Sequence, residues 1–175
     1  MKKKILIALA VLIGIVYISN LLSMRFTTAP VYTPTPTVQA TNTTAPLLDE
    51  YDILNYLDEL LIEVCPDTHD MSYELRGGRN VLTVRVWDST TKSFAWAATQ
   101  GIEPHATEWA EFSGSIIEGS KNWHELFELN GHDIMVFVNY VNPDNVEEYY
   151  ISACNGVLVY DGPRGIDLMD QLFGQ

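Results

Sequence analysis

Residues 134–141 read Ile-Met-Val-Phe-Val-Asn-Tyr-Val, an almost unbroken apolar run inside a strongly acidic part of the chain. A short run of this kind, rich in β-branched and aromatic residues, predicts a strand buried in the middle of a sheet. This stretch therefore predicts that the domain around it is built on a β-sheet.

Downstream of this run, the sequence predicts two further strands and a closing helix. Apolar residues alternate over 149–154, and Asn155-Gly156 is a strong signal for a type I′ hairpin turn. Residues 157–160 then return as the last strand. Residues 166–173 have the composition of a short helix that closes the domain.

Upstream, apolar residues recur at helical spacing in three segments. These segments cover residues 48–64, 90–100 and 104–130. Between the first two helices, residues 71–76 and 82–87 alternate in hydrophobicity on either side of Gly77-Gly78, which predicts a β-hairpin.

The predicted fold class is a two-layer α+β domain. The order is one helix, two strands, two helices, three strands and one helix. Because neighbouring strands are joined by short connections, we expect an antiparallel sheet of about five strands. The helices are expected mainly on one face of this sheet.

Part of the sequence resembles a known group of proteins. The resemblance is carried by Trp123 in the long helix, by Val136-Phe137-Val138-Asn139 leading to Asn142, and by Asn155-Gly156 before Val159-Tyr160-Asp161. These features resemble uncharacterised membrane-tethered domains of Gram-positive bacteria, over about the last third of the chain. The resemblance implies a location and a fold, but no activity and no functional residues.

The amino terminus predicts a membrane anchor within residues 1–26. Lys2, Lys3 and Lys4 precede an apolar segment, residues 5–22, whose 18 residues would span about 27 Å as a helix. The lysines should remain in the cytoplasm, so the rest of the chain should lie outside it. The alternative is a cleaved signal peptide and a secreted protein. Its best cleavage site, after Ala29, is followed by the unfavourable Pro30.

Residues 27–46 predict a disordered stalk between this anchor and the domain at 47–175. The segment holds eight Thr, four Pro and no charged residue. Such a composition cannot bury a core, and its prolines favour extended polyproline II, which would reach about 60 Å.

The charge of the chain limits its partners. The formal net charge is −13, and the 47–175 region alone carries six basic and 23 acidic residues, a net charge of −17. This surface would repel phosphate backbones, so we expect no nucleic-acid partner.

Three sets of residues are candidates for metal binding or a covalent link. Cys65 and Cys154 are the only cysteines, and outside the cytoplasm they could form a disulfide or remain separate buried thiols. His124 and Glu128 share a helix face and form a candidate metal pair, or a plain ion pair. The acidic loops 67–70 and 142–145 could hold Ca²⁺ or another divalent cation, or could simply form Asx turns. No other cofactor is predicted.

Two classes of function follow from these patterns. The first is a non-enzymatic, surface-displayed binding or assembly module, with Thr83, Arg85 and Trp87 as a platform for a protein partner on the strand face without helices. The second is a small cell-envelope enzyme or metal-dependent accessory protein. It would require His105, His124 or His132 to gather with carboxylates in one cleft.

Overall fold

The computed structural model describes residues 47–173. The expected anchor (1–26) and stalk (27–46) lie outside this part of the chain. Its helices are α2 (Glu50–Val64), α3 (Thr91–Thr99), α4 (His105–Leu129) and α5 (Met169–Phe173). Its strands are β1 (His69–Arg76), β2 (Arg79–Val86), β3 (Ile134–Asn142), β4 (Asn145–Cys154), β5 (Val157–Asp161) and β6 (Ile166–Asp167). Within 47–173, no helix is long and apolar enough to cross a membrane.

The ends of the helices follow local chemistry. The side chain of Asp49 accepts a hydrogen bond of 2.7 Å from the backbone N–H of Tyr51 and so caps the start of α2. Gly131, with φ of 83°, lets the chain turn after α4. The predicted helices at 48–64, 90–100 and 104–130 are therefore confirmed to within a few residues.

The α+β class is confirmed, but the expected antiparallel sheet of about five strands is wrong in two respects. The sheet has six strands in the order β1-β2-β3-β4-β5-β6, and β2 pairs with β3 in parallel. The parallel pair arises because α3 and α4 lie between these strands and carry the chain back to the end of the sheet where β2 began. The sixth strand, β6, occupies the start of the segment expected to be the closing helix, which shortens that helix to α5.

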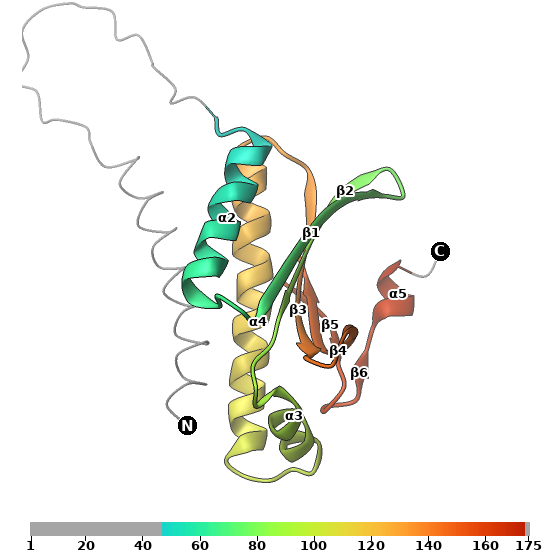
Figure 1. The fold of residues 1–175 in the computed structure, drawn as a ribbon. Coiled ribbons are helices and arrows are strands. Elements are labelled where there is room, and N and C mark those ends of the chain that lie inside the picture. The colour runs from blue at the N-terminus through green and yellow to red at the C-terminus, as the bar shows by residue number, and fades with distance from the viewer. Residues whose placement is uncertain (1–46, 174–175) are drawn as a thin grey trace, which may run out of the picture.

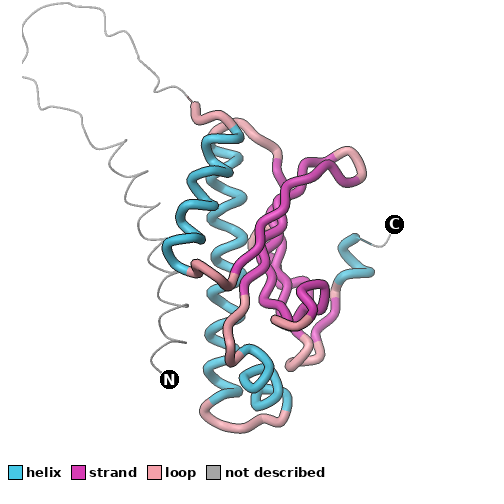
Figure 2. The backbone as a smooth tube through the Cα atoms, viewed as in Figure 1, coloured by secondary structure: helices cyan, strands magenta, loops and turns pink. Residues whose placement is uncertain are grey.

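The hydrophobic core lies between the sheet and the helices α2 and α4, which run along the same face (Figure 1). Leu57 and Phe127 from the helices meet Leu82 and Val136 from the central strands, and none of the four is exposed. The smooth backbone trace in Figure 2 shows the same two layers, with α3 near one end of α4. The face of β2, β3 and β4 turned away from α2 and α4 is called the outer face below.

The turn predicted at Asn155-Gly156 is confirmed. Both residues have positive φ, 48° and 82°, as a type I′ turn requires. The turn lies against α4, because the backbone N–H of Gly156 donates a hydrogen bond of 2.9 Å to Oγ of Ser120.

Candidate functional site

A groove of about 330 Å³ lies between α3 and the strands β4 and β5. Helix α3 buries Phe94 and Ala95 against the core, which turns Trp96 outward with 62% of its surface exposed. Lys92, Trp96 and Thr99 line the groove from α3, at positions that share one side of a helix. An exposed indole beside a hollow is a common feature of binding surfaces.

The opposite wall of the groove is aromatic. Tyr149 and Tyr150 come from β4, Tyr160 comes from β5, and Pro163 follows in the next turn. All three tyrosines are partly buried. Burial raises the pKa of Tyr150, and the negative charge of Glu148 adds to this effect. Its hydroxyl is protonated at neutral pH, as in any ordinary tyrosine, and can donate a hydrogen bond.

The charged groups of the groove already have partners. The ammonium group of Lys92 is paired with the carboxylate of Asp144. Oε2 of Glu148 accepts a hydrogen bond of 2.7 Å from Nδ2 of Asn142. The groove therefore offers aromatic faces and hydroxyl groups rather than an unpaired charge, an arrangement that suits an uncharged ligand.

The residues predicted as an open binding platform are placed differently. Thr83 and Arg85 lie on the outer face, but only 4% and 7% of their surfaces are exposed. Trp87 is partly exposed just beyond β2, where its backbone N–H donates a hydrogen bond to the carbonyl of Thr68. Thr83 and Arg85 therefore do not form the exposed surface that a platform for a partner needs, and Arg85 is covered by side chains from β1 and β4.

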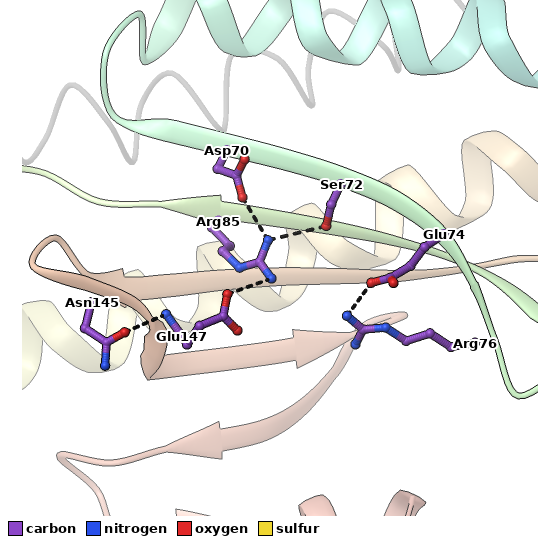
Figure 3. A network of polar contacts seen from close by, with 7 residues as sticks. All are labelled: Asp70, Ser72, Glu74, Arg76, Arg85, Asn145 and Glu147. Atoms are coloured by element: carbon purple, nitrogen blue, oxygen red, sulfur yellow. Dashed lines mark hydrogen bonds and ion pairs between the residues drawn. The ribbon is translucent and has the colours of Figure 1, made fainter.

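Arg85 is enclosed by carboxylates from both sides of β2 (Figure 3). Its Nη1 donates hydrogen bonds to Asp70 at 2.8 Å and to Ser72 at 3.3 Å, both on β1. Its Nη2 lies 3.5 Å from a carboxylate oxygen of Glu147 on β4. Arg85 thus links β1, β2 and β4 across the outer face.

A row of buried polar atoms runs beside this ion pair. Arg85 is opposite Asn139 on β3, and Asn139 is opposite Ser152 on β4. Four polar atoms are buried and have no hydrogen-bond partner among residues 47–173: Nε of Arg85, Oδ1 of Asn139, Oγ of Ser152 and Oγ1 of nearby Thr83. Buried polar atoms are normally satisfied by protein or by ordered water, so this row is the natural place for bound water on the outer face.

The candidate metal pair, His124 and Glu128, makes structural contacts within the fold. The two ring nitrogens of His124 lie 2.9 Å from the carbonyl oxygen of Ile134 and 3.3 Å from a carboxylate oxygen of Glu128. The ring thereby joins α4 to the start of β3. Residues 47–173 contain no group of three or more histidine, cysteine, aspartate or glutamate side chains arranged to hold a metal.

The histidines named for an enzymatic site lie apart. His105 is at the start of α4, where it contacts Glu108 at 3.0 Å. His124 lies 19 residues further along the same helix, about 28 Å away at 1.5 Å per residue. His132 contacts the carbonyl of Leu48 at 2.9 Å. His105 therefore lies far from His124 along α4, and each of the three rings has polar contacts of its own.

Both cysteines are free, buried thiols in the structure. Cys65 ends α2, and Cys154 ends β4. Burial raises the pKa of Cys154 to about 12, and it also raises the pKa of Cys65, where the nearby charge of Asp88 adds to the effect. A raised pKa keeps these thiols in the protonated form at neutral pH, which is the less nucleophilic form.

The groove has no signature in the sequence patterns described above. Trp96 lay in a predicted helix, and Tyr149 and Tyr150 lay in a predicted strand, but no pattern indicated that these elements meet. The available signal was the adjacent pair Tyr149-Tyr150, because one of two successive strand residues always faces away from the core.

Comparison of the chain with protein-family models, with curated proteins and with solved structures gives no match.

Proposed function

We propose that this chain is a non-enzymatic, membrane-tethered binding or assembly module whose domain takes up an extended, uncharged polypeptide in the groove between α3 and the strands β4 and β5. The observation that carries this proposal is the exposed indole of Trp96 facing a wall of three tyrosines.

Aromatic grooves of this kind suit proline-containing chains. A polyproline II segment is already extended, so it loses little conformational freedom when it binds. Proline rings pack against flat aromatic faces, and the carbonyls of the segment accept hydrogen bonds from tyrosine hydroxyls. The pairing of Lys92 with Asp144 and of Glu148 with Asn142 removes the groups that would select a charged ligand.

The amino-terminal sequence supports the tethered location. Three lysines followed by the apolar segment 5–22 would anchor the chain, and residues 27–46 would carry the domain away from the bilayer. The net charge of −17 on residues 47–175 would keep the domain off anionic lipid.

Fluorine NMR of the full chain in detergent micelles tests this function. The protein has four tryptophans, so labelling with 5-fluorotryptophan should give four resonances, and Trp96→Phe would assign the one from the groove. A synthetic polyproline peptide should shift the Trp96 resonance saturably. The resonances of Trp109 and Trp123, which are buried in the core, should not move.

A glycine-serine peptide of equal length is the control ligand. It is also uncharged, but it lacks the proline rings that would pack on the groove. If the Trp96 resonance does not respond to polyproline, or responds equally to both peptides, the groove does not bind extended proline-containing chains.

A further inference from the structure

We infer that residues 27–46 of the same chain are the resident occupant of the groove, so that the stalk competes with any external partner. This inference rests on the proposed function, because it assumes that the groove takes up an extended polypeptide. The inference adds which polypeptide occupies the groove before an external partner binds.

The chemistry of the segment matches the groove. Residues 27–46 contain no charged side chain and four prolines, including the pair Pro34 and Pro36, and they contain one tyrosine, Tyr32. The groove presents Trp96 and three tyrosines, and its lysine and glutamate are already paired. A charged segment would have to break these pairs, whereas an uncharged one can lie across them.

The point at which the segment enters the domain sets the distance that it must cover. Leu48 is held at the C-terminal end of α4, because its backbone N–H donates a hydrogen bond of 2.9 Å to Oδ1 of Asn130. Helix α3 lies at the other end of α4 (Figure 1). There, the ring centroids of Phe94 and Trp109 are 5.0 Å apart. From Leu129 back to Trp109, α4 rises about 30 Å, and to its first residue about 36 Å.

The chain has the length to cross that distance. Pro36 and Pro34 precede Leu47 by 11 and 13 residues. In polyproline II these residues span about 34 to 40 Å, at 3.1 Å per residue. The prolines nearest the centre of the segment would therefore reach the end of α4 at which the groove lies.

Attachment to the same chain favours this contact even if its intrinsic affinity is weak. A short linker gives an effective concentration of about 1 mM, so a segment with a dissociation constant near that value would fill the groove about half of the time. A partner would have to displace the segment, and displacement would release the domain from the neighbourhood of the anchor.

Photo-crosslinking of the full chain in detergent micelles tests the inference. A benzoylphenylalanine in place of Trp96 should form a crosslink within one chain to residues 27–46, identified by mass spectrometry. The same group in place of Leu75, which is 70% exposed at the β1–β2 hairpin, is the matched control and should not capture that segment. At a chain concentration of about 10 µM, the internal crosslink should exceed the crosslink between chains about 100-fold.

Replacing residues 27–46 by a glycine-serine segment of equal length should abolish the internal crosslink and expose the groove to added polyproline peptide. If position 96 captures the added peptide but never residues 27–46, the inference fails while the proposed function stands. If position 96 captures neither, both fail. Crosslinks that join separate chains in proportion to concentration would also overturn the inference.

Discussion

The indole Nε1 of Trp109 donates a hydrogen bond of 2.9 Å to Oδ1 of Asp161, which joins α4 to the end of β5 across 52 positions of sequence. Neither residue is exposed to solvent. Ser113 donates a second bond of 3.0 Å to the other carboxylate oxygen, and the backbone N–H of Arg164 donates a third, of 3.1 Å. These contacts fix the end of β5, next to the groove residues Tyr160 and Pro163.

Trp109→Phe should therefore be more damaging than the same substitution at Trp123. Both residues are buried aromatic side chains of α4, so each substitution removes similar volume, but only the first removes a donor to a buried carboxylate. We expect Trp109→Phe to lower the free energy of unfolding by about 1.5–3 kcal/mol more than Trp123→Phe in urea denaturation. Equal losses would show that the bond to Asp161 contributes nothing to stability.

Replacing Gly156 in its turn by alanine should destabilise the protein more than a glycine-to-alanine substitution usually does. Gly156 has φ of 82°, and a Cβ placed there would lie 2.9 Å from Cβ of Lys121. Gly156→Ala should destabilise the protein by about 1–3 kcal/mol. Gly114→Ala is the matched control, because Gly114 is helical and has open space around it, and it should stabilise by about 0.5–1 kcal/mol. If both substitutions shift the melting temperature in the same direction, this account is wrong.

Substitution of the two partners of the Arg85–Asp70 ion pair should cost different amounts of stability. Asp70→Ala leaves the nearly buried guanidinium with Ser72 at 3.3 Å and with Glu147, at 3.5 Å, as its remaining carboxylate, so we expect a loss of about 1–2 kcal/mol. Arg85→Met should change the free energy of unfolding by less than about 1 kcal/mol. Asp70 and Glu147 would lose their partner, but their side chains are 49% and 69% exposed, so water can solvate them. Arg76→Met, on an exposed ion pair, should be neutral. A larger loss for Arg85→Met than for Asp70→Ala would contradict the argument.

Because both thiols are buried, we expect them to react slowly with thiol reagents in the folded state. At pH 8, Cys65 and Cys154 should react with a thiol reagent only after the protein unfolds, when two thiols per chain should appear. Because burial raises the pKa of Cys154 from 9.0 to about 12, the unfolded chain releases this proton first, and stability should fall as pH rises from about 9 toward about 12. No reactive thiol after unfolding without reductant would instead indicate a disulfide.

Salt should stabilise the domain without selecting calcium. The net charge of −17 predicts mutual repulsion that added ions screen. However, Asp70 of β1 is paired with Arg85, and Asp144 is paired with Lys92. Oδ1 of Asn142, at the end of β3, accepts the backbone N–H of Asp144 at 3.0 Å. We therefore expect CaCl₂ and MgCl₂ of equal ionic strength to raise the melting temperature equally. Saturation at low CaCl₂ alone would reveal a specific calcium site.

Features that depend on near neighbours in the chain could be predicted from the amino-acid pattern. The helices at 48–64 and 104–130, the hairpin around Gly77-Gly78 and the turn at Asn155-Gly156 all follow from periodicity, capping or positive φ within a few residues. The alternation along 82–87 also showed correctly that Thr83 and Arg85 face away from the core.

The contacts between distant segments could not be predicted in this way. Alternation assigns Arg85 to a face of the sheet, but its burial depends on Asp70 and Glu147, which arrive from β1 and β4. The parallel pairing of β2 with β3 depends on how α3 and α4 cross the sheet, and the groove depends on α3 lying beside β4 and β5. The physical reason is that local patterns record the conformation of a segment, whereas pairing and packing are selected by the energy of the whole core.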